Sequence, residues 1–258
     1  MYDVLSDTRL LVPLAAVLGA VIGSFLNVVI WRLPRGESLV RPGSRCTACG
    51  APVRWFDNVP VLSYLVLGGK CRACKTHFSA EYPAVEAANA GLYALLAWRF
   101  GLTPALPVYM VLTSALLAAA VIDLHHKILP DRITLPGIAV GIVASATLLP
   151  ATVVDALAGA ALGGGLYFLI AVASRGGMGG GDIKLIAMIG AFLGWQAVLL
   201  TTFLAAVVGG TVGLVLMLAF GKGRKYAVPF GPFLAAAAIV CVLWGQPIIA
   251  WYLSLGRP

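Results

Sequence analysis

The sequence predicts an all-α polytopic membrane protein with about eight transmembrane helices and a small insert between the first two. Two observations predict this class. Apolar residues make up 60% of the 258 residues and charged residues only 11%, whereas a soluble domain carries about 25% charged residues. In addition, long apolar runs recur along the chain, and about 20 such residues are enough to cross a bilayer. This composition excludes an ordinary soluble enzyme and a disordered chain.

The apolar runs give the eight helices in order. The first covers residues 10–30 and holds no charge, and the others are expected at 83–98, 106–122, 133–149, 156–174, 183–194, 197–220 and 233–253. The run at 83–98 contains Glu86, and the run at 183–194 is short and carries Lys184. Asp155 is expected to be the N-cap of the fifth helix. We therefore expect a first helix within residues 1–30, a loop at 31–82 and a membrane core at 83–258.

The basic residues are distributed as a membrane topology requires, so the net charge of +8 does not indicate nucleic-acid binding. With the N-terminus outside, 15 of the 18 lysines and arginines fall on the cytoplasmic side, and only Arg9, Arg99 and Arg257 fall outside it. The positive-inside rule then places the loop at 31–82 in the cytoplasm. Lipid is the environment that such a chain requires.

Four cysteines in this loop form two C-x2-C pairs, Cys46 with Cys49 and Cys71 with Cys74. Two such pairs match the ligand spacing of a tetrahedral zinc site. The cytoplasm is reducing, which disfavours disulfides, and four thiolates leave no open position for catalysis. The pattern therefore predicts structural zinc, with His77 as a spare ligand.

Two aspartates lie at the same cytoplasmic level in this topology. Asp123 ends the third apolar run, and Asp182 opens the sixth after a glycine-rich stretch that includes Gly179 and Gly181. Ionisable residues at the membrane are costly and indicate function by default. The glycines allow a substrate backbone to approach closely. A flexible turn with a helix-capping aspartate remains an alternative at this point.

Two facing carboxylates can share a proton, one acting as base toward water and the other as acid toward a carbonyl. Such a pair hydrolyses a peptide bond without a metal ion. Glu86 lies near the inner end of the second helix and could face the same cavity. A pair of this kind would suit a peptidase that cuts a membrane helix unwound near its inner end, while the turn with a capping aspartate stays equally open from the residues alone.

The ordered motifs resemble the bacterial type IV prepilin leader peptidase family across residues 23–232. They are Gly23-Ser-Phe-Leu-Asn-Val-Val-Ile-Trp-Arg-Leu-Pro34, the cysteine tetrad, Glu81-Tyr-Pro-Ala-Val-Glu86, Asp123 with Leu129-Pro-Asp131, Met178-Gly-Gly-Gly-Asp-Ile-Lys-Leu185 and Val228-Pro-Phe-Gly-Pro232. Trp31 stands where tyrosine is common in that family.

The resemblance implies an aspartic intramembrane peptidase of the G-x-G-D type in a bacterial inner membrane, with its N-terminus in the periplasm. The catalytic aspartates carry over to Asp123 and Asp182. The substrates are prepilins and pseudopilins, cut after a glycine that ends a basic leader. The cysteine tetrad implies the bifunctional type, which also N-methylates the new N-terminus with S-adenosylmethionine. Lys127 and Lys184 are expected to pair with a glutamate that follows the scissile bond.

Two other functions remain open from the sequence. A transporter also uses broken helices and polar residues at depth, but this chain shows no repeat and places its aspartates at one face. A redox protein would cycle the cysteine pairs between thiol and disulfide rather than hold a metal. The sequence does not indicate an oligomeric state.

Overall fold

The structure is a computed structural model that describes residues 8–174, 177–220 and 228–255. The basic residues at 175, 222, 224, 225 and 257, which enter the charge count above, lie outside the described residues. The described chain is helical and contains no strand, only two isolated β-bridges in the loop. It divides into two compact units, Met1–Ala118 and Ala119–Pro258.

Eight long helices match the eight expected runs, with ends within four residues of the expected ones. They are α2 (Thr8–Arg32), α4 (Glu81–Phe100), α5 (Ala105–His126), α6 (Asp131–Ser145), α7 (Val153–Ala173), α8 (Gly180–Leu193), α9 (Trp195–Phe220) and α10 (Gly231–Leu255). In the described part of the chain, five of them (α2, α5, α7, α9 and α10) are long and apolar enough to cross a membrane. The others fall short because α6 and α8 have 15 and 14 residues and because charged and polar side chains such as Glu86 and Asn89 lower the hydropathy of α4.

The start of α7 corrects one expectation. Thr152, not Asp155, is the N-cap, and Asp155 is the third helical residue of a capping box in which the two side chains bond each other's backbone N–H. The helix begins earlier than the hydropathy indicates because this reciprocal capping satisfies donors that are otherwise orphaned.

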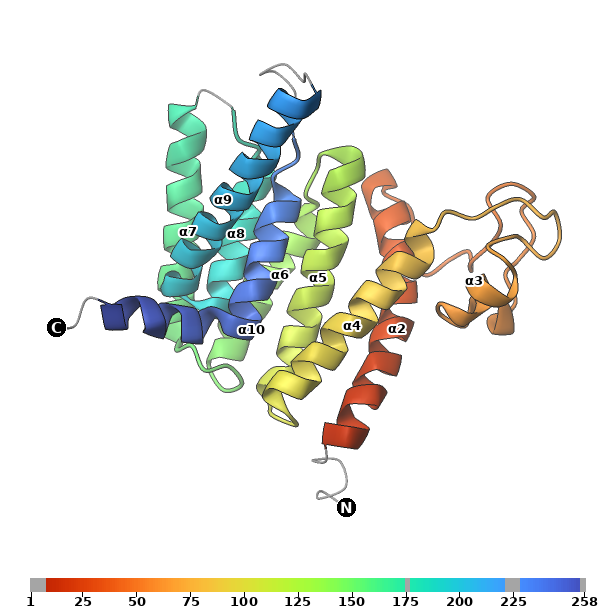
Figure 1. Ribbon diagram of the computed structural model, residues 1–258, viewed down its shortest axis with the longest axis horizontal. Coiled ribbons are helices and arrows are strands. Elements are labelled where there is room, and N and C mark those ends of the chain that lie inside the picture. Colours follow the sequence, from red (N-terminus) through yellow and green to blue (C-terminus); the bar gives the residue numbers. More distant parts are fainter. Residues whose placement is uncertain (1–7, 175–176, 221–227, 256–258) are drawn as a thin grey trace. The chain divides into compact units, whose positions relative to one another are not determined.

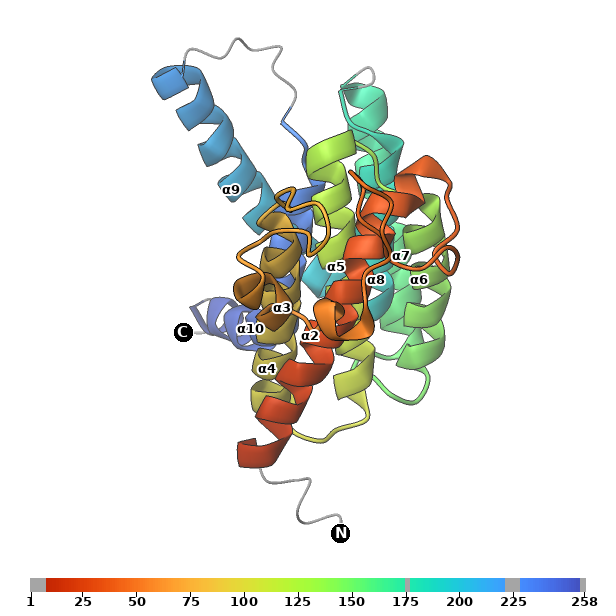
Figure 2. The ribbon, with the colours of Figure 1, turned by 90° about the vertical axis from the view of Figure 1, so that its right-hand side faces the viewer.

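In the first unit, α2 and α4 lie side by side in both views (Figure 1 and Figure 2) and touch through small residues. A Cβ at Gly19 would lie 2.7 Å from the carbonyl oxygen of Asn89, and a Cβ at Gly23 would lie 2.7 Å from the Cα of Glu86. Glycines four residues apart let two membrane helices approach this closely. The buried Asn89 side chain then donates to the Gly19 carbonyl at 2.8 Å and accepts from Ser114 at 2.9 Å.

The segment between α2 and α4, residues 33–80, is called the cysteine loop here. It leaves the end of α2 and returns to the start of α4 (Figure 1), and it contains the short helices η1 (Leu33–Arg35), η2 (Trp55–Asn58) and α3 (Leu62–Val66). Its large hydrophobic side chains are mostly exposed, Trp55 at 83% among them. A segment with so little apolar core needs cross-links to hold its shape.

In the second unit, α8 lies between α6 and α7 and is buried from Leu185 to Phe192. Glycines again set the spacing, because a Cβ at Gly159 of α7 would lie 2.4 Å from the carbonyl oxygen of Gly190. On the other side, a Cβ at Gly141 of α6 would lie 2.8 Å from the Phe192 ring. This enclosure explains how a 14-residue helix can lie in a membrane bundle, since its backbone groups are satisfied internally and protein surrounds it.

The last helix, α10, contains Pro247, and its final turns run across the direction of its first turns (Figure 1). Proline removes a backbone donor and clashes with the preceding turn, which accounts for such a bend. The first residue of α10, Gly231, is buried against the candidate site described next.

Candidate active site and metal centre

Asp123 lies in the last turn of α5 and is 6% exposed. The helix stops shortly after it because Lys127 adopts a φ of 53° and donates its N–H to the Asp123 carbonyl at 2.9 Å. A left-handed residue at this position usually ends a helix. The C-terminal end of a helix carries a partial negative charge, so a buried carboxylate there is electrostatically disfavoured. Local helix stability therefore does not explain this aspartate.

Asp182 is the third residue of α8, and Gly179 is the N-cap. Asp182 is not the N-cap itself, since the N-cap is Gly179, but its carboxylate accepts a backbone hydrogen bond from Gly179, as a third helical residue can. Within the described residues, the Oδ1 atom of Asp182 is buried and has no hydrogen-bond partner. A buried acceptor left unpaired costs stability, so its presence calls for a functional reason.

The fold brings the two carboxylates close enough to interact electrostatically. The backbone N–H of Gly231 donates to Oδ2 of Asp123 at 3.0 Å and fixes the orientation of that carboxylate. The Leu129 side chain lies against both Gly181 and Gly231. A Cβ would lie 2.7 Å from it at Gly181 and 3.2 Å from it at Gly231. Two carboxylates held beside an apolar wall suit general acid–base chemistry.

Leu129, Gly231 and Tyr167 also lie at this site, and sequence reasoning does not assign them a role there. Tyr167 is fully buried, lies within electrostatic range of Asp182 and packs 6.5 Å from the Phe230 ring. The family motifs contain Leu129 and Gly231, but a motif does not reveal which backbone N–H faces a carboxylate. Tyr167 lies in an apolar run and has no sequence signal.

The other residues expected at the site have different surroundings. Lys184 forms an ion pair with Asp131 at 2.7 Å, which joins the first turns of α6 and α8. Lys127 ends α5, as described above. The two expected glycines differ in their surroundings. Gly181 is crowded by the Leu129 side chain, whereas a Cβ at Gly179 would meet only Oδ2 of Asp182, at 3.5 Å.

Glu86 belongs to the first unit. Its Oε2 accepts the N–H of Val61 in the cysteine loop at 2.7 Å. The side chain is buried and lines a cavity formed by α2, α4 and this loop. The structure thus gives Glu86 a position at the loop-side end of its own helix pair.

The four cysteines come together, and one sulfur from each lies within 4.8 Å of all the others. Two matching turns bring this about. In the first, Gly50 (φ 72°) donates its N–H to the Cys46 carbonyl at 2.9 Å, and in the second Lys75 (φ 61°) donates to the Cys71 carbonyl at 3.0 Å. The Cys46 and Cys74 sulfurs are 3.7 Å apart, close to the edge of about 3.8 Å that a tetrahedron with 2.3 Å metal–sulfur bonds requires. The cluster fits one tetrahedral metal ion.

Hydrogen bonds prepare Cys74 to act as a ligand. Its sulfur shares a hydrogen bond with the Thr76 hydroxyl at 3.3 Å, and this bond, together with the Thr76 backbone, lowers the pKa of the Cys74 thiol to about 6. Because metals bind the thiolate, a lowered pKa at Cys74 favours the ligating form of this sulfur.

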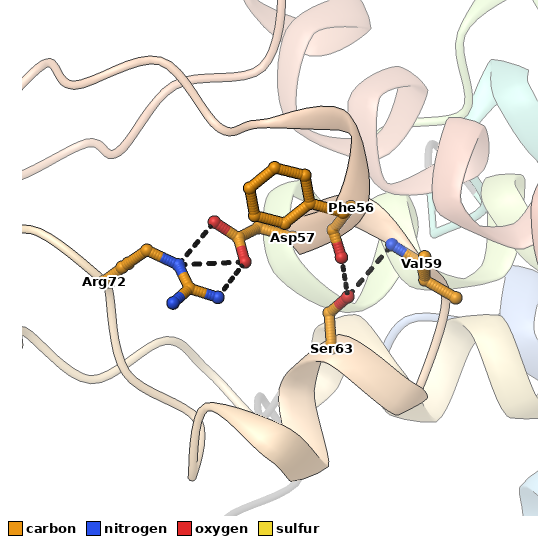
Figure 3. A network of polar contacts seen from close by, with 5 residues as sticks. All are labelled: Phe56, Asp57, Val59, Ser63 and Arg72. Atoms are coloured by element: carbon orange, nitrogen blue, oxygen red, sulfur yellow. Dashed lines mark hydrogen bonds and ion pairs between the residues drawn. The ribbon is translucent and has the colours of Figure 1, made fainter.

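An ion pair ties the second cysteine turn to the rest of the loop (Figure 3). Arg72, between the two cysteines of that turn, donates to both carboxylate oxygens of Asp57, the shortest bond being 2.6 Å. The Arg72 guanidinium lowers the pKa of Asp57. The Ser63 hydroxyl donates to the Phe56 carbonyl and accepts the Val59 N–H, so the turn of η2 is held at both ends.

Comparisons with known proteins match the chain to two family models, one in each half. Residues 17–100 match the model described as bacterial peptidase A24 N-terminal domain, and residues 110–214 match the type IV leader peptidase family. No solved structure matches the chain.

The chain is also similar to proteins named prepilin leader peptidase/N-methyltransferase. It is 40% identical to one from Pseudomonas putida, over 95% of this chain and 94% of the relative. It is 38% identical to one from Pseudomonas aeruginosa, over 94% of this chain and 95% of the relative. It is 43% identical to one from Myxococcus xanthus, over 80% of this chain and 63% of the relative. The first matched region holds the cysteine cluster and the second holds both aspartates, and the chain belongs to the type IV leader peptidase family.

Proposed function

We propose that this protein cleaves the basic leader from type IV prepilins and pseudopilins by a two-aspartate mechanism. The cut falls after a glycine, at the cytoplasmic face of the bacterial inner membrane. The names of the relatives and the electrostatic proximity of the Asp123 and Asp182 carboxylates support this function. The apolar helices support a multi-pass membrane location, with the N-terminus periplasmic and the cysteine loop cytoplasmic.

In this mechanism the carboxylates of Asp123 and Asp182 share one proton. The ionised member takes a proton from water as the water oxygen attacks the scissile carbonyl, and the protonated member donates to the carbonyl oxygen. When the carbon–nitrogen bond breaks, the pair returns a proton to the leaving amine. The bond from the Gly231 N–H to Asp123 holds one carboxylate in place throughout.

One observation carries the proposal. In the described part of the molecule, Oδ1 of Asp182 is buried without a hydrogen-bond partner, within electrostatic range of a second carboxylate. A protein that needed this residue only for stability would pair the oxygen. A catalytic pair needs an unpaired oxygen to receive water and the substrate carbonyl.

The test is cleavage of a purified model prepilin in detergent by the wild type, Asp123→Asn and Asp182→Asn. We expect both variants to leave the leader attached, because an amide cannot take up the proton. Asp155→Asn is the matched control, since Asp155 caps the far end of α7. Cleavage by either active-site variant at the wild-type rate would refute the mechanism.

We further propose that the cysteine cluster holds one structural zinc ion. Zinc prefers four thiolates in a tetrahedral site, and such a site has no open position for substrate. Metal analysis of the purified protein should give one zinc per chain, lost when Cys46 and Cys49 are both replaced by serine. Reversible disulfides in place of bound metal would support a redox role instead.

The names of the relatives also support a second activity, N-methylation of the new N-terminus. S-adenosylmethionine is the expected donor, and its sulfonium supplies an activated methyl group. The role of this chain is to bind the donor and to orient the amine toward it. Mass spectrometry of the cleaved pilin tests this, because methylation adds one methyl group only when the donor is present.

A further inference from the structure

A cavity of about 750 Å³ lies between the cysteine loop and the loop-side ends of α2 and α4. Asn27 of α2, Glu86 of α4 and Val61 and Tyr64 of the loop are among the residues that line it, and all belong to the first unit. Pockets for small organic ligands have volumes of about 300–1,000 Å³. The proposed peptidase mechanism leaves this cavity without a function.

The charged side chains that line the cavity include one buried carboxylate, Glu86, and exposed groups that are mostly cationic: Arg41, Arg45 and Lys70 with Glu37. The buried carboxylate of Glu86 has one oxygen bonded to the Val61 N–H. Arg41 and Arg45, which also line the cavity, are exposed. A buried carboxylate in a partly apolar wall favours a cationic ligand group, and exposed guanidinium groups favour a carboxylate.

Aromatic side chains form another part of the wall. Tyr64 donates its hydroxyl to the Phe78 carbonyl at 3.3 Å, and the Phe78 and Tyr82 rings meet edge to face with 6.5 Å between centroids. The Asn27 side chain fixes the next segment by donating to the Tyr82 carbonyl at 3.1 Å. Such rings stack on a flat heterocycle and attract cations through their faces.

Val61 shows that this region keeps a strained conformation. Val61 has a φ of 61° and a ψ of −50°. A β-branched residue rarely adopts a positive φ. Strain of this kind persists only where the surroundings impose it, and it clusters at binding sites. Here the bond to Glu86 helps impose it.

We propose that this cavity binds S-adenosylmethionine, with Glu86 facing its cationic sulfonium and the aromatic wall facing its adenine. This inference rests on the proposed methyltransferase activity. The donor combines a cation, a carboxylate and a flat heterocycle, which are the three groups that the cavity walls favour. In the transfer, the amine lone pair forms the new N–C bond, the C–S bond breaks to leave a neutral thioether, and the amine releases a proton to solvent.

The test is equilibrium dialysis of tritiated S-adenosylmethionine against the full-length, metal-loaded protein in detergent. Glu86→Gln keeps an acceptor for the Val61 N–H and removes only the charge. We expect it to raise the Kd for S-adenosylmethionine by about tenfold and the Kd for S-adenosylhomocysteine, whose thioether sulfur carries no charge, by much less. Glu81→Gln, on the same helix but outside the cavity lining, is the matched control and should bind as the wild type.

A general loss of structure would weaken both ligands equally and would overturn the role of Glu86. Photolabelling of the wild type with the tritiated donor provides a second measurement that needs no variant. Label on peptides from residues 21–86 is expected, and label confined to residues 119–258 would overturn the cavity assignment. Wild-type protein that cleaves prepilin but binds no donor would overturn the methyltransferase function itself and leave the peptidase function intact.

Discussion

Gly159→Ala is a sharp test of the close contact between α7 and α8. A Cβ at this position would lie 2.4 Å from the Gly190 carbonyl oxygen and 2.7 Å from the carbonyl carbon of Gly194. Ordinary van der Waals contacts of a Cβ begin at 3.4 Å. The distance from the new Cβ to the Gly190 oxygen must therefore increase by about 1 Å. Backbone atoms cannot rotate aside as a side chain can, so the two helices must separate.

Two costs follow from this separation. Overpacking lowers the free energy of unfolding by about 1–3 kcal/mol. In addition, α8 carries Asp182 in its first turn, and a displacement of about 1 Å at a reacting group costs about 100-fold in rate. We therefore expect Gly159→Ala to lower both the unfolding temperature and the rate of prepilin cleavage.

The matched control is Gly165→Ala in the same helix, where a Cβ would meet no atom within 4 Å. Both substitutions change the helix propensity by the same amount, about 1 kcal/mol in favour of alanine. Initial cleavage rates and thermal unfolding are measured in one detergent. Equal rates and equal unfolding temperatures for the two variants would refute the argument from close backbone contact.

Three further outcomes are expected. Gly231→Ala, whose Cβ would lie 2.7 Å from Oδ2 of Asp123, should slow cleavage by about 100-fold with little change in zinc content, and an unchanged rate would contradict the proposed role of this contact. Thr76→Val removes a hydrogen bond that lowers the pKa of the Cys74 thiol, so this pKa should rise. During acidification the thiolate is then protonated at a higher pH, and the pH at which half of the zinc is released should rise with it. Asp131→Asn frees the Lys184 ammonium and should lower KM for a substrate with a glutamate after the cut but not for one without it, and equal KM changes would exclude that pairing.

The helices and the cysteine cluster could be predicted because each depends on a signal within a short stretch of sequence. Apolar runs locate helices whatever their neighbours are, and two C-x2-C pairs bring four sulfurs together through local turns. The expected helix ends differ most where hydropathy and capping disagree, as at Thr152.

The packing around α8 could not be predicted in this way. The run at 183–194 is weak as a membrane span because it is short and carries Lys184. Hydropathy does not show that α6 and α7 enclose this helix. The spacing of Gly159 and Gly163 on α7 and of Gly137 and Gly141 on α6 was the available signal. Lys184 illustrates the same limit, since its partner Asp131 lies 53 positions away in the sequence.

The Gly231 N–H that holds Asp123 comes from a residue 108 positions later in the chain. Because α5 is synthesised before α10, a nascent chain that ends before residue 231 lacks the backbone N–H that holds the Asp123 carboxylate.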